Sequence, residues 1–182
     1  MSVNELAAQR RQAIRRFLFI LLIVAIGTIA AIFITQARLL AAPEQPIAYS
    51  HQTHVEADIQ CLYCHTQATH STIAGIPSVE RCMGCHSVIA TEDETVQQLA
   101  AYWEQGEPIL WVRVNNQPDF VYFSHRPHLG AGLNCETCHG NIGAMDEARP
   151  VQRMDMGWCL ECHEDQEPEH VTRLVDCMAC HK

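Results

Sequence analysis

All ten cysteines of this chain fall into five pairs of one form, and a histidine follows each pair at once. The pattern is Cys-x-x-Cys-His, the attachment signature of c-type haem. In such a site the two thiols form thioether bonds to the porphyrin, and the histidine binds iron from one face. The five sites are Cys61, Cys64 and His65; Cys82, Cys85 and His86; Cys135, Cys138 and His139; Cys159, Cys162 and His163; Cys177, Cys180 and His181. The sequence therefore predicts five haem c groups, each with an iron ion.

Other uses of paired cysteines fit this pattern poorly. A disulfide framework gives no reason for a histidine after every pair. A structural zinc site needs four ligands, usually from two pairs, and five pairs do not divide into such sites. A thioredoxin-like redox motif would occur once, beside a strand and a helix. Repetition of one pentapeptide five times thus favours haem attachment over all three.

The ligand on the second face of each iron decides what the haem can do. An open position permits substrate chemistry, whereas two strong ligands make an electron carrier. Six histidines lie outside the motifs, and this number nearly matches the five irons: His51, His54, His70, His125, His128 and His170. Every motif keeps its histidine, so we expect electron transfer and no catalytic residue.

Four of these histidines belong to an internal repeat. The segments YSHQTHVEADIQCLYCH (49–65) and FSHRPHLGAGLNCETCH (123–139) both begin aromatic-Ser-His-x-x-His and end in a haem motif. We call the first six residues of each segment a histidine box. The distance from the first histidine of the box to the next cysteine is also equal, because His51 precedes Cys61 as His125 precedes Cys135. A repeat that keeps the spacing of possible ligands has chemical content.

A histidine box followed by Cys-x-x-Cys-His resembles the class III, cytochrome c3/c7-type multihaem family. The resemblance implies that the first histidine of the box binds the haem of the next motif and the second binds a haem further along. The implied pairs are His51 with His65, His54 with His86, His125 with His139, and His128 with His163. The iron at His181 has no clear partner, because the c7-type histidine before the middle motif is replaced by RMDMGWCLECH. Met156 or His70 is the expected ligand, and Met154 and His170 stay as alternatives.

Residues 17–35 read FLFILLIVAIGTIAAIFIT and carry no charge. Nineteen residues of helix span roughly 28 Å, close to the hydrocarbon thickness of a bilayer. Four arginines precede the run and only Arg38 follows it closely, which predicts an N-terminus in the cytoplasm and a haem domain in the periplasm of a bacterial inner membrane. A cleavable signal peptide, ending near Leu40, is the alternative. We favour a retained single-pass anchor, because the run exceeds a usual signal core.

The exterior part is acidic. Residues 43–182 contain seven basic and twenty acidic residues. This charge repels nucleic acid, so no nucleic acid partner is expected, and it favours a protein partner with a cationic patch. Solubility alone is the other explanation of the charge.

The chain is divided into an N-terminus and transmembrane anchor (1–42), a two-haem module (43–87), a linker (88–118) and a three-haem module (119–182). The linker is predicted to contain a helix, capped by Thr91 and Glu94 and ended by Gly106, and to enter a β-hairpin formed by residues 109–114 and 118–123. About 140 residues cannot build a large core around five haems. The predicted fold is thus one transmembrane helix and a haem-dominated, mostly irregular multihaem cytochrome c domain with short helices and one β-hairpin.

The anchor, the two-plus-three arrangement of motifs, WVRV…PDFVYFSH and MGWC together resemble the pentahaem cytochrome c subunits of alternative complex III. That resemblance implies an electron-transfer subunit of a membrane quinol-oxidising complex. Its partners would be other membrane and iron–sulfur subunits, and a periplasmic monohaem cytochrome or terminal oxidase. The alternative is a stand-alone, membrane-anchored quinol dehydrogenase of the NapC/NrfH type.

Overall fold

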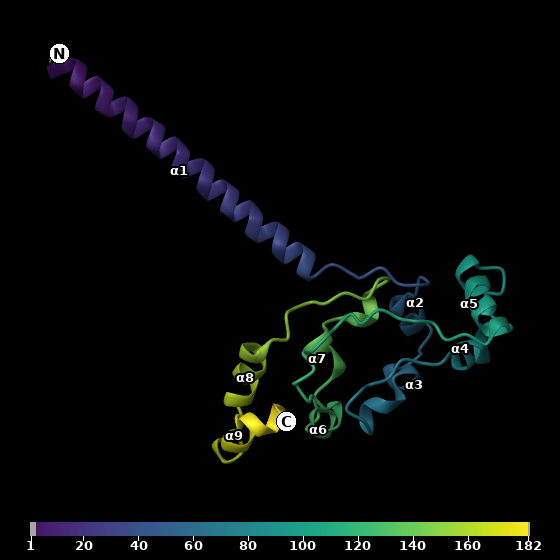
Figure 1. The fold of residues 1–182 in the computed structure, drawn as a ribbon. Helices are drawn as coiled ribbons and strands as arrows, with labels where there is room; N and C mark the ends of the chain where they lie inside the picture. Colours follow the sequence, from purple (N-terminus) through teal and green to yellow (C-terminus); the bar gives the residue numbers. More distant parts are fainter. Residues whose placement is uncertain (1–2, 182) are drawn as a thin grey trace. The chain divides into compact units, whose positions relative to one another are not determined.

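The computed structural model describes residues 3–181, which divide into two compact units, Met1–Ala41 and Ala42–Lys182. The described part of the first unit is mainly one helix, and the second unit is built from short helices joined by irregular chain (Figure 1). The elements are α1 (Val3–Leu39), α2 (His51–Glu56), α3 (Cys61–Cys64), η1 (Thr66–Thr69), α4 (Val79–His86), α5 (Glu94–Gln105), α6 (His125–Gly130), α7 (Cys135–His139), η2 (Ile142–Ala144), α8 (Met156–Glu164), α9 (Pro168–Leu174) and α10 (Cys177–Cys180).

Helix α1 contains the predicted apolar run and extends beyond both of its ends. Its span from Gln9 to Leu39 includes an 18-residue window of mean hydropathy 3.1, none of which is buried by protein. Inside the run the hydroxyl groups of Thr28 and Thr35 donate to the carbonyl oxygens of Ala25 and Ala31 at 2.8 Å. These bonds satisfy the polar groups within the helix itself, as a lipid environment requires. By length and composition α1 is a candidate membrane span.

The predicted β-hairpin at residues 109–123 is wrong. Among residues 3–181 no strand is formed, and the one isolated bridge joins Val121 to His181. The backbone groups that a hairpin would pair are used elsewhere. The side chain of Gln45 donates to the Val112 carbonyl at 3.0 Å and accepts from the Val112 amide at 2.9 Å. The amide of Tyr122 donates to the carbonyl of Cys180 at 2.8 Å. Each half of the predicted hairpin is thus bound to a different part of the unit.

The linker helix is confirmed as α5, with a corrected start. The side chain of Asp93 accepts hydrogen bonds from the amides of Thr95 and Val96 at 2.8 and 3.2 Å, so Asp93, and not Thr91, is the N-cap. Gly106 ends the helix in the left-handed conformation, at φ 67°. This conformation suits glycine, which has no Cβ to clash.

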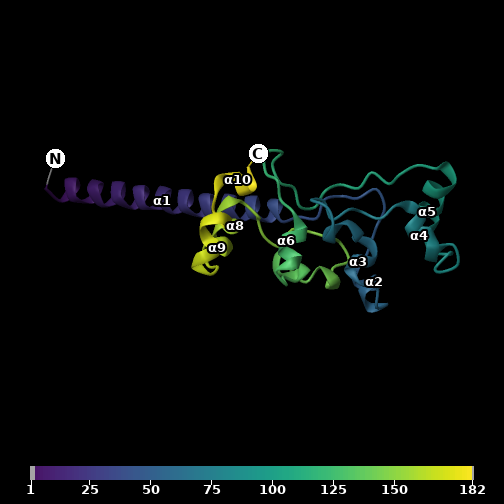
Figure 2. The same ribbon diagram turned by 90° about the horizontal axis from the view of Figure 1, so that it is seen from below.

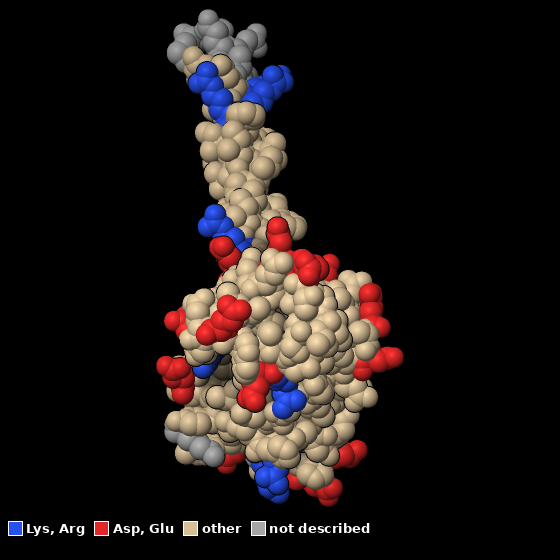
Figure 3. Space-filling view, turned by 90° about the vertical axis from the view of Figure 1, so that its right-hand side faces the viewer, with Lys and Arg blue, Asp and Glu red and all other residues tan. Residues whose placement is uncertain are grey.

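Little of the second unit is a conventional core. The buried side chains among the described residues are all apolar and few, namely Ile47, Ala68, Val96, Leu99 and Ile109. Three of them form one cluster, in which α5 packs against α4 and the segment around Ile109. Arginines lie at both ends of α1, and Asp and Glu side chains are scattered over the second unit without a basic patch on the face that Figure 3 shows. A fold with so small a core depends on something other than side-chain packing.

The two predicted modules interlock. Helix α2 of the first packs on η2 of the second, where the Ser50 hydroxyl donates to Asp146 at 2.7 Å and the Gln52 amide donates to the Met145 carbonyl at 3.1 Å. In the other direction, α6 of the second module packs on η1 of the first. Because of this packing, residues 42–182 form one structural unit. The division of this unit into modules stays a prediction.

Candidate haem-binding centres

Each Cys-x-x-Cys-His motif lies on its own helix, and these helices are α3, α4, α7, α8 and α10. Three residues make almost one helical turn, so the two thiols of each pair face the same side. The histidine that follows directly comes at the helix end. Across residues 3–181 none of the ten cysteines forms a disulfide, so every thiol is free for attachment.

The thiols of different motifs come close to one another in a definite order. Burial raises the pKa of the Cys82 thiol, and its neighbour Cys64 of the first motif raises it further. Burial likewise raises the pKa of Cys135, followed by the effect of Cys61, to which it is hydrogen-bonded. The first motif therefore lies between the second motif and the third.

The order continues toward the C-terminus. Burial raises the pKa of Cys138, with Cys162 as the neighbour that adds to it. Burial also raises the pKa of Cys159, and the largest neighbouring contribution comes from Cys180 of the last motif. The motif helices accordingly follow one another from α4 through α3 and α7 to α8, as Figure 1 shows, and α10 lies beside α8 in Figure 2.

In the first histidine box one aromatic ring touches both histidines. The ring of Tyr49 lies edge-on to His51, with centroids 4.9 Å apart and planes at 89°. The same ring stacks on His54 at 4.5 Å and 27°. Nδ1 of His54 lies 2.8 Å from the carbonyl oxygen of Ser50. Among the described side chains, Nδ1 of His51 is a buried polar atom without a protein partner.

The second histidine box repeats this geometry closely. The ring of Phe123 lies edge-on to His125 at 4.9 Å and 86°, and faces His128 at 4.6 Å and 33°. Nδ1 of His128 lies 2.8 Å from the carbonyl oxygen of Ser124, as in the first box. Nδ1 of His125 has a partner, the Thr72 carbonyl at 3.4 Å. The repeated sequence thus folds into a repeated arrangement of two imidazoles around one ring.

Histidines of the boxes face motif histidines across a gap of similar width. The ring centroids are 6.0 Å apart for His54 and His86, 6.4 Å for His125 and His139, and 6.0 Å for His128 and His163. With about 2 Å from each nitrogen to a metal ion and about 1 Å from each nitrogen to its ring centre, imidazoles on opposite sides of one metal have centroids about 6 Å apart. The three separations therefore suit one iron between each pair.

The fourth predicted pair, His51 and His65, is close enough to interact electrostatically. Burial lowers the pKa of His51, and His65 and then His54 lower it further. Burial also lowers the pKa of His125 and of His139, and His65 contributes to both shifts. A lowered pKa keeps the imidazole neutral, the form that binds metal ions.

Most of the predicted histidine ligands hold Nδ1 against a backbone carbonyl oxygen. A carbonyl oxygen can only accept, so in a neutral ring Nδ1 carries the proton and Nε2 is left free to bind iron. The carbonyl partners are Ser50 for His54, Gly75 for His65, Ile89 for His86, Thr72 for His125, Ser124 for His128, Leu174 for His163 and Phe120 for His181, at distances from 2.6 to 3.4 Å. Such partners fix the ring orientation of metal-binding histidines.

His139 uses an amide side chain instead of a carbonyl. Its Nδ1 lies 3.1 Å from the side-chain nitrogen of Asn115. The two ends of an amide exchange by rotation, and the ligand role of His139 requires the oxygen to face the ring. Neither Asn115 nor the carbonyl partners above were identified from the sequence. A backbone carbonyl has no sequence signature, and Asn115 lies between the two predicted strands, in a segment to which no role was given.

The candidates for the fifth iron are placed less clearly. Among the described residues, the ring of His181 stacks on the ring of Phe120, with centroids 5.8 Å apart and planes at 30°. Met156 opens α8, one turn before Cys159, and is 64 % exposed. The carbonyl of Met154 accepts from Gln117 at 2.9 Å. His170 lies 3.8 Å from Glu169 and is exposed. His70 follows η1, and the contacts described for it are backbone ones.

The residues present fit haem better than a protein-only metal site. Within residues 3–181 no three His, Cys, Asp or Glu side chains converge on one point, which zinc would require. The imidazoles instead come in pairs. An iron that is already held by four porphyrin nitrogens needs two further ligands, which such a pair would supply.

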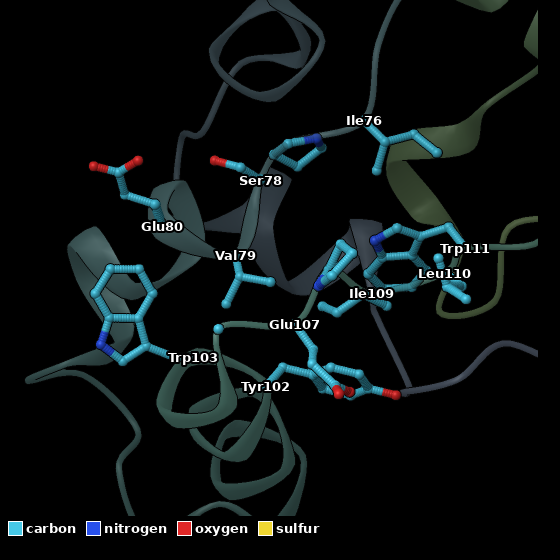
Figure 4. Close-up of a pocket in the computed structure, with 13 residues that line it drawn as sticks. Ile76, Ser78, Val79, Glu80, Tyr102, Trp103, Glu107, Ile109, Leu110 and Trp111 are labelled. Carbon is cyan, nitrogen blue, oxygen red and sulfur yellow. The ribbon is translucent and has the colours of Figure 1, made fainter.

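A cavity of about 770 Å³ lies beside the second motif but contains none of its ligands (Figure 4). It is lined by Val79 of α4, the α5 aromatics Tyr102 and Trp103, and the chain from Gly106 to Trp111, so it is a largely apolar groove next to the small core. The chemistry described above lies outside it.

Two comparisons with known proteins agree with this chemistry. The family of cytochrome c7 and related cytochromes c matches residues 121–182. The menaquinone reductase, multiheme cytochrome c subunit, of Nitratidesulfovibrio vulgaris is 32 % identical over 167 residues, which cover 79 % of this chain and 80 % of that protein. The chain therefore belongs to the family of this multihaem cytochrome c subunit, and its residues 121–182 are similar to cytochrome c7.

Proposed function

We propose that this multihaem cytochrome c is the electron-transfer subunit of a membrane quinol-oxidising complex of the alternative complex III type. The observation that carries the proposal is the pairing of box and motif imidazoles about 6 Å apart, with Nδ1 of each ring hydrogen-bonded. An iron held by two imidazoles has no open position for a substrate, so the chain itself is not a catalyst.

The proposed iron ligands follow from these pairs. His54 and His86, His125 and His139, and His128 and His163 would each hold one iron, and His51 would hold the iron at His65 together with that residue. For the fifth iron, at His181, Met156 is better supported than His70. Met156 lies on the same side of α8 as Cys159, and Cys159 neighbours the last motif through Cys180.

The haem group, when bound, supplies a reversible one-electron iron couple. The chain contributes position and electrostatics. Five attachment helices fix five haems in one unit, and the hydrogen bonds at Nδ1 hold the ligand rings in place before and after an electron passes. Because the ligands do not change, each transfer needs little reorganisation.

The spatial order of the motifs defines the proposed electron path. The proximity of the thiols supports the order two, one, three, four, five, with the first and third motifs joining the two modules. Electrons would therefore enter or leave at the second and fifth haems, which lie at the two ends. The path follows the order of the motifs in the sequence, except that the first two motifs are exchanged.

The donor and acceptor are carried over from the resemblance. We propose quinol as the source, reached through membrane and iron–sulfur subunits, and a periplasmic monohaem cytochrome or oxidase as the acceptor. Helix α1 would be the anchor, with its arginine-rich N-terminus in the cytoplasm. The relative from N. vulgaris is named for the opposite reaction, menaquinone reduction. A subunit that delivers electrons to menaquinone is thus the second candidate.

One purification distinguishes these candidates. The full chain, tagged and extracted from its own membranes in mild detergent, is expected to carry five haems by mass and to bring other subunits with it. Adding a menaquinol should reduce the haems, as seen in the visible α-band. Haems that stay oxidised with menaquinol, but pass electrons to menaquinone once reduced, would favour the second candidate. A lone monomer that oxidises quinol would instead favour the NapC/NrfH type.

The fifth iron has its own test in the same sample. A methionine–iron charge-transfer band in the oxidised spectrum that disappears in Met156→Ala identifies Met156 as the ligand. Persistence of the spectrum in Met156→Ala, together with its change in His70→Ala, assigns the iron to His70.

A further inference from the structure

The aromatic residue of each histidine box contacts both histidines of that box, and it does so in the same way in the two boxes. Tyr49 touches His51 edge-on and His54 face-on, and Phe123 touches His125 edge-on and His128 face-on. The corresponding centroid distances differ by no more than 0.1 Å between the boxes. The corresponding angles differ by only a few degrees, although the two boxes have different surroundings.

The two histidines of a box face different motifs. His54 faces His86 of the second motif, and the pKa of its neighbour His51 responds to His65 of the first. In the second box His125 faces His139 and His128 faces His163. One aromatic ring therefore lies between the proposed ligands of two irons.

Contacts of this kind restrict how an imidazole can rotate about its bond to iron. The face of an aromatic ring is negative and its edge positive, so edge-on and offset-stacked neighbours have preferred orientations. The second histidine of each box is also held at Nδ1 by the serine carbonyl, and His125 is held by the Thr72 carbonyl. His51 is therefore the ring that depends most on the aromatic contact.

We propose that Tyr49 and Phe123 are positioning residues, each of which sets the imidazole planes of two different haems at once. This inference rests on the proposed function, because it needs the histidines of the boxes to bind iron. The orientation of an axial imidazole determines how its orbitals overlap with those of iron. It therefore affects the electron paramagnetic resonance (EPR) g-values and the reduction potential of a ferric haem, without changing which ligands are present.

The ring, and not the hydroxyl group of Tyr49, carries this role. Phe123 gives the same geometry with no hydroxyl. Trp111 packs edge-on against the ring of Tyr49 at 6.3 Å and helps to hold it in place.

The experiment uses low-temperature EPR and redox titration of the purified, haem-loaded full chain. Tyr49→Leu should shift the largest g-value of two of the five ferric signals, and Phe123→Leu should shift two others. Tyr49→Phe and Phe123→Tyr should each leave all five signals in place, because the ring is retained. All variants are first shown to carry five haems by mass.

A variant that loses haem is replaced by Tyr49→Met or Phe123→Met, which keep most of the volume without the ring. The inference is overturned if the ring-free variants leave every signal unchanged, or if all five signals shift together as in general loosening. A shift of a single signal also overturns it, since one ring is proposed to act on two haems. If the unsubstituted protein shows no low-spin signals from bis-histidine haems, the proposed function fails instead.

Discussion

The two histidine boxes share their inner geometry and differ in what supports it. In both, one ring contacts two imidazoles, and the second imidazole is held by a serine carbonyl. Outside this inner set the boxes diverge. Ser50 caps α2 and donates to Asp146, whereas the described side chain of Ser124 makes no cap hydrogen bond. The repeat thus fixes the positions of the proposed ligands, whereas the residues that hold each box in place differ between the two modules.

The first histidines of the boxes show the same division. Nδ1 of His125 is paired with the Thr72 carbonyl, which the other module supplies, while Nδ1 of His51 has no partner in the described protein. The chain after the following motif also differs. Thr66 begins the 3₁₀ turn η1, but Gly140 takes a left-handed conformation at φ 65°. These differences give matched pairs of substitutions.

The largest effect is expected from removing the second histidine of either box. In His54→Ala or His128→Ala one iron loses a ligand, so carbon monoxide bound to the reduced protein should rise by about one haem equivalent. Thr66→Ala, which removes no candidate ligand, should bind no more than the unsubstituted protein. If only one box responds, the two are not equivalent and the ligand assignment of the other is wrong.

The next largest effect is expected in the segment that directly follows a haem motif, where the two modules differ. A Cβ on Gly140 would lie 2.7 Å from Cγ1 of Val151, and the residue has a positive φ. Gly140→Ala should therefore lower the free energy of unfolding by about 2–5 kcal/mol, from left-handed strain and overpacking together. Thr66→Ala is the control in the first module and should change it by less than about 0.5 kcal/mol. Denaturant unfolding of the haem-loaded protein, followed at the Soret band, measures both.

The serines test whether the outer supports differ as described. Ser50→Ala loses the cap on the Thr53 amide and the bond to Asp146, and should cost about 1–3 kcal/mol of unfolding free energy. Ser124→Ala loses neither kind of bond and should stay within about 0.5 kcal/mol. Equal losses in the same unfolding assay would show that the boxes are supported alike.

The smallest effect concerns the imidazole held by a side chain. Asn115→Leu removes the Nδ1 partner of His139, which makes this ring a weaker donor to its iron and should raise the reduction potential of that haem. We expect a shift below about 59 mV, which is a tenfold change in a one-electron equilibrium. Asn116→Leu is the neighbouring control. No such variant exists for His65, whose partner is the backbone of Gly75.

The parts of the structure that the sequence predicted are those encoded over short distances. The motif helices, α5 and the apolar part of α1 follow from spacing within one or a few turns. The β-hairpin was predicted wrongly, because residues 109–123 do have extended, alternating character. Their hydrogen bonds are taken by Gln45 and Cys180, which lie more than fifty residues away in the chain. The carbonyl partners of the histidines were missed for a similar reason, since the fold and not the residue type brings them to the ring.

The ligand pairs could be predicted from the sequence only in part. The repeated aromatic-Ser-His-x-x-His pattern pointed to His51, His54, His125 and His128, and the structure brings three of them to within about 6 Å of a motif histidine. Their roles as iron ligands stay predictions. The fifth ligand was left open by the sequence because its pattern departs from the family there.

The two hydrogen bonds between Gln45 and Val112 hold the beginning of the second unit in place. Only five residues lie between Leu39, the last residue of α1, and Gln45, whose side chain makes these bonds. Fully extended, such a segment reaches at most about 20 Å. If α1 spans a bilayer as proposed, this short segment would limit how far the second unit could move from the membrane. The proposed electron donor and acceptor would then have to approach the membrane surface.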